Sequence, residues 1–296
     1  MQISDNARGA AYMCVSMAAF TLNDTAMKSV TQTMPLFQAI ALRGVLALAG
    51  LIVLGKVMGS LRWRMSRGDA VAVGIRSLAE VAATALFLGA LIHMPLANLS
   101  AIMQALPLAV TLAAALVFRE TIGWRRMTAI LVGFVGVLII IRPGPDGFDL
   151  WSLMGLGSVG CVVVRDLATR RLSRDLPSVN VAVWAALAVT VMGGLVTTFE
   201  GWQPVTAGQG SLVAVAALTL LIGYMFAVMV MRVGDIGFVA PFRYTALLWA
   251  IVLGWLAFGA MPDGFTLFGA SLVVGSGVFT LLRERRLKKR VLPARV

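Results

Sequence analysis

Ten stretches of the chain are long and apolar enough to form membrane-spanning helices. A spanning helix needs roughly 20 mostly apolar residues, and polar turns such as Arg142–Phe148 and Glu200–Gly210 separate the stretches. No connection between them is long enough for a soluble domain. The pattern predicts an all-α membrane protein with ten transmembrane helices, over Ala10–Val30, Leu36–Met58, Asp69–Ile92, Pro95–Phe118, Trp124–Ile141, Phe148–Thr169, Ser178–Phe199, Ser211–Met231, Gly237–Gly259 and Gly264–Leu282.

The two halves of the chain are similar when one is shifted by 141 residues. The segment Gly123–Val137 (GWRRMTAILVGFVGV) then aligns with Gly264–Val278 (GFTLFGASLVVGSGV). A five-helix unit that is repeated once enters the membrane from opposite sides, because five is odd, and many secondary transporters have such inverted repeats. We therefore expect one repeat over residues 1–142 and a second over 143–296 with a basic cytoplasmic tail. A binding site is expected between the repeats, near the midplane.

Composition and charge agree with this architecture. The 296 residues are 59% hydrophobic and 13% charged, which is too apolar for a soluble core. Most of the net charge of +12 comes from loops on one side of the membrane and from the C-terminal tail, and Arg142 is the only basic residue in the loops on the other side. Because Lys and Arg gather in cytoplasmic loops, we expect both termini in the cytoplasm. The same distribution argues against a nucleic-acid partner.

Several other classes of protein lack the residues that they need. Gly155–Gly160 (GLGSVG) resembles a dinucleotide-binding motif but lies within an apolar span, and Gly50–Val57 has valine where a P-loop needs Ser or Thr. His93 is the only histidine, and both cysteines lie in apolar runs. The sequence predicts no enzyme activity, no cofactor and no metal site. Small residues at four-residue spacing are expected to serve close helix packing, as at Ala129, Gly133, Ser271 and Gly275.

Charged residues inside the spans are the main candidates for function, since such groups usually face a cavity or a partner. They are Asp24, Lys28, Arg43, Arg76, Glu80, Arg165, Asp166 and Arg243. A rise of 1.5 Å per residue puts the first three near the outer ends of their helices, Glu80 near the middle and the other arginines nearer the inner ends. The cations outnumber the anions, which favours a ligand with a carboxylate.

Two of these pairs have the spacing of an intrahelical ion pair. Asp24 and Lys28 stand four residues apart, as do Arg76 and Glu80, so each pair can neutralise itself on one helix face. Alternatively, Lys28 extends to the lipid headgroups, which Glu80 is too short and too deep to do. We expect Asp24 and Lys28 to shape the outer half of a cavity.

The other charged residues have less obvious partners. Arg165 and Asp166 are adjacent and point about 100° apart on a helix, so we expect them to have different partners. No acidic residue lies within one helical turn of Arg243 in the sequence. Arg243 is therefore either a cation for an external anion or one that extends to the inner surface. Glu80 and Arg243 are the expected central site.

The apolar part of a ligand would need a soft or aromatic wall. The candidates for that wall are Met103, Trp184, Tyr224, Tyr244 and Trp249, although each aromatic residue could instead pack against a helix or face lipid. Pro107 frees a backbone carbonyl beside Gln104. This feature either lines the cavity or is a packing kink.

The whole chain resembles the ten-helix, EamA-type branch of the drug/metabolite transporter superfamily. The resemblance is carried by Ala97–Ile122 (ANLSAIMQALPLAVTLAAALVFRETI), with Pro107 and Glu120 in place, and by FTLNDTAMKSV, with Asn23 and Lys28 in place. The second half departs from the pattern, with Leu248 and Met261 at the equivalent positions. Within the superfamily the chain looks most like YddG-type aromatic amino acid exporters.

This resemblance implies a secondary-active exporter of small amphipathic metabolites, such as aromatic and other amino acids, that works by alternating access. The expected partners are that substrate and the lipid bilayer, in a bacterial inner membrane, with the oligomeric state open. Two alternatives remain. One is a permease for anionic metabolites or sugar phosphates, and the other is a non-transporting membrane scaffold, for which the short loops offer no partner-binding segment.

Overall fold

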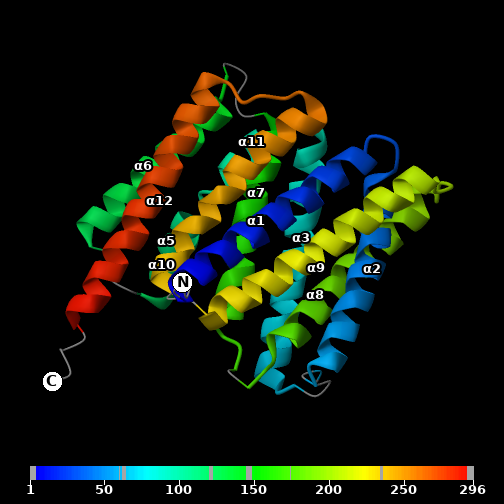
Figure 1. Cartoon of the computed structure of the whole chain (residues 1–296), viewed down its shortest axis with the longest axis horizontal. Helices are drawn as coiled ribbons and strands as arrows, with labels where there is room; N and C mark the ends of the chain where they lie inside the picture. The colour runs from blue at the N-terminus through cyan, green and yellow to red at the C-terminus, as the bar shows by residue number, and fades with distance from the viewer. Residues whose placement is uncertain are drawn as a thin grey trace. The chain divides into compact units, whose positions relative to one another are not determined.

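The protein is helical almost throughout (Figure 1). The computed structural model describes residues 5–59, 61, 65–119, 123–144, 149–173, 175–233 and 236–291, so Glu120 and Phe148 lie outside the described residues. The helices are α1 (Asp5–Val30), α2 (Leu36–Val57), α3 (Arg67–His93), α4 (Leu96–Met103), α5 (Leu106–Phe118), α6 (Trp124–Ile141), α7 (Leu150–Thr169), α8 (Ser178–Glu200), α9 (Ala207–Val233), α10 (Ile236–Val239), the 3₁₀ helix η1 (Ala240–Tyr244), α11 (Thr245–Phe258) and α12 (Gly264–Val291).

This helix order confirms the predicted fold class. Among the described residues, nine helical stretches are long and apolar enough to cross a membrane, and α1, with 26 residues, is the tenth helix of the expected set. The elements assigned in the described ranges include no β-strand. The predicted spans therefore correspond to helices along the whole sequence, with ends that differ by a few residues.

Proline and serine define several helix starts. Pro35, Pro95 and Pro177 are the N-cap residues of α2, α4 and α8, where the missing N–H and the fixed φ of proline cost nothing. At the start of α3, the Ser66 Oγ accepts a hydrogen bond from the Asp69 N–H at 3.0 Å, which satisfies one of the free N–H groups of the first turn.

Two of the predicted spans are broken helices. The fourth span is interrupted at Gln104 and Ala105, between α4 and α5, with Pro107 in the first turn of α5. This confirms the predicted kink. The ninth span was predicted as one helix, and this was wrong, because Gly237–Gly259 contains α10, η1 and α11. Pro241 lies in the first turn of η1, and a proline there removes one backbone donor from the α-helical pattern.

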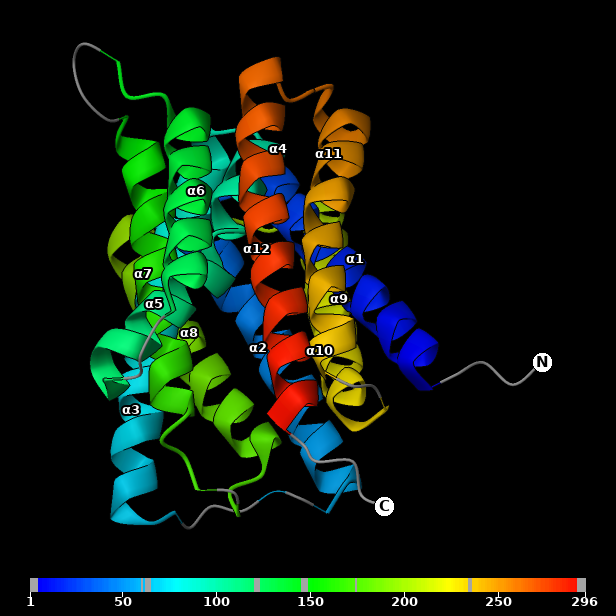
Figure 2. The same ribbon diagram turned by 90° about the vertical axis from the view of Figure 1, so that its left-hand side faces the viewer.

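The chain divides into two compact units, which are described separately. Unit 1 contains Met1–Thr21, Pro95–Asp149 and Ile222–Val296, and unit 2 contains Leu22–Met94 and Leu150–Leu221. In unit 1, α6 packs along α12 and α4 along α11; in unit 2, α3 packs along α7 and α2 along α8. Figures 1 and 2 both show α6 and α12 side by side. Three of these contacts, α6 with α12, α4 with α11 and α2 with α8, join helices that hold the same place in the order of the first and second halves of the chain.

Glycine allows the closest helix approach in unit 1. A Cβ added at Gly136 would stand 2.6 Å from the carbonyl oxygen of Gly269, so α6 and α12 touch backbone to backbone. Gly133 is buried beside this crossing, as predicted. The predicted packing role of Ser271 and Gly275 was wrong, because both are exposed and no atom lies within 4 Å of a Cβ at Gly275. These two residues lie on a different face of α12 from the one that meets α6.

Candidate functional site

Three candidate residues form a chain of hydrogen bonds in unit 2. Arg43 Nη1 on α2 donates to Asn23 Oδ1 on α1 at 3.2 Å, and Asn23 Nδ2 donates to Asp24 Oδ1 at 2.9 Å. The side chains of Asn23 and Arg43 are buried. We call Asn23, Asp24 and Arg43 the outer cluster, after the side of the membrane that the sequence predicts for it. It links α1 to α2 through groups that the apolar surroundings could not otherwise satisfy.

Lys28 binds the C-terminal end of α3. Its Nζ donates to the carbonyl oxygens of Leu91 and Met94, at 2.6 and 2.7 Å. α3 ends at His93, so these carbonyls belong to its last turn and its C-cap, where backbone acceptors lack intrahelical donors and the helix dipole favours a cation. No pattern in the sequence predicts this partner for Lys28.

Four charged residues meet between α3 and α7 in unit 2, and we call them the inner cluster. Glu80 Oε2 lies 3.8 Å from Arg76 Nη2 on its own helix, as the four-residue spacing predicted. Arg165 Nη1 on α7 donates to both Glu80 carboxylate oxygens at 3.4 Å. Arg165 Nη2 also lies 2.9 Å from Asp166 Oδ1. The cluster therefore holds two cations and two anions.

The expectation that Arg165 and Asp166 have different partners was wrong in one respect. Their Cβ atoms diverge, but the long Arg165 side chain ends in a fork of donors that reaches its neighbour's carboxylate as well as Glu80. The sequence analysis also missed Thr169. Its Oγ1 accepts from Arg76 Nε at 3.2 Å and donates to the Arg165 carbonyl at 2.7 Å. A hydroxyl one helical turn after Arg165 was the available signal.

Further candidate residues surround the two helix breaks of unit 1. Gln104 is buried at the first break, between the half-buried Met103 and Pro107. At the second break, Tyr244 ends η1 and is buried, whereas Arg243 beside it is exposed. The Tyr244 hydroxyl is buried and has no hydrogen-bond partner among the described residues.

The remaining aromatic candidates lie on α8, α9 and α11. The Tyr224 ring on α9 packs edge-on against Phe20 on α1, with ring centroids 5.5 Å apart, in unit 1. Trp249 on α11 is 38% exposed. In unit 2, Trp184 is half-buried on α8. The structure thus brings the charged candidates of unit 2, other than Lys28, into two clusters and leaves the aromatic ones on separate helices.

The described part of the chain offers no geometry that matches a metal site or a nucleotide site. No group of three or more His, Cys, Asp or Glu residues is placed to hold a metal ion among the described residues. Gly155–Gly160 lies inside α7 and Gly50–Val57 inside α2. Continuous helix offers no loop of free N–H groups for a phosphate.

Comparison with known proteins agrees with this architecture. The sequence profile of the EamA-like transporter family matches residues 7–142 and again residues 149–282. A crystal structure superposes with a TM-score of 0.62 and 22% identity, over 94% of this chain and 99% of that one, which supports the fold alone.

Several similar proteins are named after different substrates. The riboflavin transporter of Vibrio cholerae serotype O1 is 31% identical over 199 residues, which span 64% of each chain. The S-adenosylmethionine uptake transporter of Rickettsia prowazekii is 21% identical over 65% of each chain. The pseudopaline exporter of Pseudomonas aeruginosa is 23% identical over 87% of this chain and 91% of that protein. The three proteins named above are transporters of small metabolites. Because the profile of the EamA-like transporter family matches both halves of the chain, the chain belongs to this family.

Proposed function

We propose that the protein is a secondary transporter for a small amphipathic metabolite that combines a flat aromatic or heteroaromatic ring with a polar chain. The observation that carries the proposal is the doubled family match together with the charge-balanced inner cluster of Arg76, Glu80, Arg165 and Asp166. Ionisable groups inside a membrane protein usually mark a pathway for substrate or ions. The proposal includes two inverted repeats over residues 1–142 and 143–296, alternating access and a bacterial inner membrane with cytoplasmic termini.

Riboflavin is the first substrate to test. Riboflavin transporters of three bacteria are 25 to 31% identical to this chain, and riboflavin joins a flat ring to a polyhydroxyl chain. Aromatic amino acids share the ring but not the size, and they are the second class to test. In this proposal, aromatic and methionine side chains of unit 1, from Met103, Tyr224, Tyr244 and Trp249, supply contacts to the ring.

The arrangement of charge supports a neutral or zwitterionic substrate over a phosphorylated one. Arg76 and Arg165 lie beside Glu80 and Asp166, and Arg43 contributes to the outer cluster through Asn23. Lys28 binds two backbone carbonyls. The cationic surplus counted along the spans is thus largely engaged within the protein, which weakens the case for an anionic metabolite.

The direct test is counterflow in proteoliposomes. Proteoliposomes that contain the purified protein are loaded with one unlabelled compound, and the same compound is added outside in radiolabelled form. The compounds are riboflavin, S-adenosylmethionine, phenylalanine, tryptophan and a sugar phosphate. We expect exchange of riboflavin or of an aromatic amino acid, and none of the sugar phosphate. Exchange of the sugar phosphate alone would contradict the proposal. If none of the five compounds is exchanged, the proposed substrate class is wrong.

Glu80 is the proposed proton carrier, because it is the deepest acidic residue of the spans. A neutral Glu80→Gln side chain cannot carry a proton through a transport cycle. The expected result is that accumulation driven by a pH gradient is lost while counterflow is kept. Gradient-driven accumulation at the wild-type rate in Glu80→Gln would exclude this role.

A further inference from the structure

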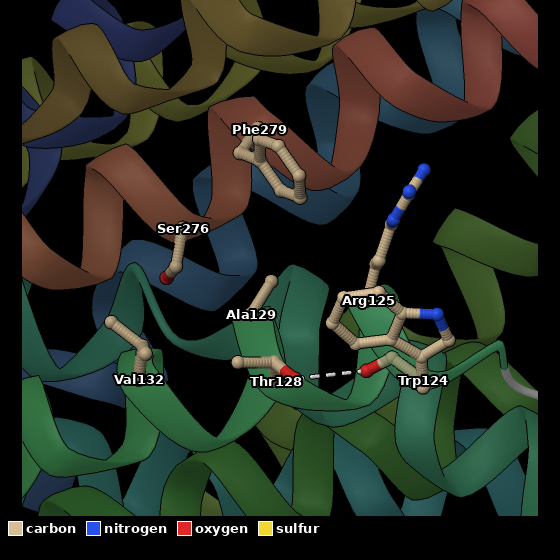
Figure 3. A pocket seen from close by; sticks show the side chains of 7 residues that line it. All are labelled: Trp124, Arg125, Thr128, Ala129, Val132, Ser276 and Phe279. Atoms are coloured by element: carbon tan, nitrogen blue, oxygen red, sulfur yellow. Dashed lines mark hydrogen bonds between the residues drawn. The ribbon is translucent and has the colours of Figure 1, made fainter.

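An open groove runs between α6 and α12 in unit 1, with a cavity volume of about 430 Å³. Figure 3 shows Trp124, Thr128 and Val132 on one side, and Ser276 and Phe279 on the other. The groove exists because small side chains stand where the helices meet, while Trp124 and Phe279 stand out as a rim, 73% and 50% exposed. Its volume is in the range of sites that hold small molecules.

One end of the groove is positively charged. Arg125 lines it, and Figure 3 shows its side chain extending from α6 toward α12. The guanidinium carbon of Arg125 lies 5.1 Å from the ring centre of Trp124. Trp and Arg at a helix end are typical of the boundary between lipid tails and headgroups.

A second arginine follows the groove along α12. A Cβ at Gly136 would meet Gly269, and one at Gly133 would meet Ser276 Oγ, so α6 and α12 are antiparallel. Continuing this register places Arg283, one helical turn beyond the lining residue Phe279, about level with Arg125 along the two helices. Arg283 Nη1 is buried and has no hydrogen-bond partner among the described residues. A buried guanidinium donor of this kind requires an acceptor.

We propose that this groove binds one anionic phospholipid, with an acyl chain along the apolar wall and the phosphate on Arg125 and Arg283. The chemistry of the groove matches the two ends of this ligand. Val132, Phe279 and the Trp124 ring offer carbon surface to the chain, and guanidinium groups bind phosphate through paired N–H donors. A polar, water-soluble substrate would gain little from the apolar wall. A second copy of this chain is the other possible occupant, and the experiment distinguishes it.

The test uses photoactivatable lipids in vesicles. Full-length protein is reconstituted with phosphatidylglycerol that carries a diazirine on its acyl chain, or with the matched phosphatidylcholine, and adducts are mapped by mass spectrometry. We expect adducts on residues 124–132 and 276–279, about 25-fold more with phosphatidylglycerol, since each of the two basic residues near an anionic headgroup contributes about five-fold.

Four variants test the roles of the two arginines and of the groove. Arg125→Gln and Arg283→Gln should each lower phosphatidylglycerol labelling about five-fold and lower phosphatidylcholine labelling less, because the choline offsets the charge of its phosphate. Thr128→Phe, at an exposed position on α6, should fill the groove and reduce labelling by both lipids. Arg171→Gln, at an exposed arginine of unit 2, removes the same charge elsewhere and should change nothing.

Three outcomes would overturn the proposal. The first is equal labelling by the two headgroups, which is ordinary annular lipid. The second is a phosphatidylglycerol preference that survives replacement of both arginines. The third is cross-linking of these segments to a second copy of the chain in place of lipid, which assigns the groove to a dimer interface. Counterflow assays on the same samples report the transport function separately.

Discussion

A lysine in a membrane-spanning helix needs acceptors for its N–H donors, and Lys28 finds two at the carbonyls of Leu91 and Met94. These carbonyls lie at the end of α3, where no further helical turn supplies donors. The ammonium and the helix end therefore satisfy each other. At the scale of single residues, this contact identifies Lys28 as a link between α1 and α3, in addition to any role in the substrate path.

Replacing Lys28 by methionine should lower stability by about 2 kcal/mol, because hydrogen bonds to a charged donor contribute roughly 1.5–3 kcal/mol each before relaxation and water entry. Thermal unfolding in detergent measures the change. Lys56→Met is the matched control, since Lys56 is exposed in the last turn of α2. Equal effects of the two substitutions would show that the α3 contact contributes nothing.

The pairing of Glu80 with Arg165 is the second residue-scale feature with a measurable consequence. Removing one partner of a fully buried ion pair costs roughly 3–5 kcal/mol, and this pair is partly buried, with Arg76 still beside Glu80 and Asp166 still beside Arg165. We therefore expect Glu80→Gln and Arg165→Gln each to destabilise the protein by less than that amount, and the double variant to cost clearly less than the sum. A double-mutant cycle on unfolding free energies measures this.

The exposed pair of Arg8 and Asp5, 3.7 Å apart on α1, is the control for that cycle. Ion pairs on an exposed surface typically contribute no more than about 1 kcal/mol, so Arg8→Gln should have a small effect. Additive effects of the Glu80 and Arg165 substitutions would mean that the two side chains do not interact in the membrane.

At the scale of helices, the broken fourth and ninth spans are the distinctive elements. A break frees backbone carbonyls and N–H groups that transporters use around their substrates. The first break could be predicted from Pro107 and the buried Gln104. The second was missed because Pro241 lies near the start of the apolar run, where a proline normally marks only a helix beginning. Repeat symmetry pointed elsewhere, since Leu248 is the residue equivalent to Pro107.

Tyr244 at the second break depends on a glycine in α12. A Cβ at Gly277 would overlap the Tyr244 hydroxyl, so Gly277→Ala must displace η1 or rotate the ring. We expect a loss of about 1–3 kcal/mol, as for overpacked cores, together with slower transport if the break moves during the cycle. Thermal unfolding and counterflow measure the two effects.

Gly275→Ala is the matched control on the same helix, because open space surrounds that position. Alanine there should be neutral or slightly stabilising, since it favours helix over glycine. A Gly277→Ala variant as stable as Gly275→Ala would mean that Tyr244 can leave its position without cost.

At the scale of the whole chain, hydrophobic patterning predicted the helices and their order, because nine of the helices in the described residues carry an apolar signal of roughly 20 residues. The partners of the polar residues could not be predicted in the same way. Lys28 and Leu91 are 63 residues apart and Arg165 and Glu80 are 85 apart, so only the folded chain brings them together. Gln38 is a further case, since its buried amide binds the Gln203 backbone at 2.7 and 3.0 Å.

Arg142 shows how one such contact joins distant parts of unit 1. It is the only basic residue in the predicted outer loops, and its guanidinium forms an ion pair with Asp263 and donates to Thr266 Oγ1 at 3.3 Å. Asp263 also accepts from the Thr266 N–H at 2.9 Å, which caps the start of α12. The contact therefore fastens the end of α6 to the start of α12.

This contact should make stability depend on pH. The hydrogen bond from Arg142, followed by that from the Thr266 backbone, holds the pKa of Asp263 well below its usual range, which is about 3.9 in unfolded chains. A depressed pKa in the folded state means that the stabilisation is fully present above about pH 4 and is lost as the pH falls further. The difference in melting temperature between wild type and Asp263→Asn should thus stay constant from pH 8 to 5 and shrink below about pH 4.

Asp175→Asn, at an exposed position in the α7–α8 connection, controls for the loss of one negative charge. A difference that persists unchanged below pH 4, or a profile shared by both variants, would mean that the Asp263 carboxylate does not hold α6 and α12 together.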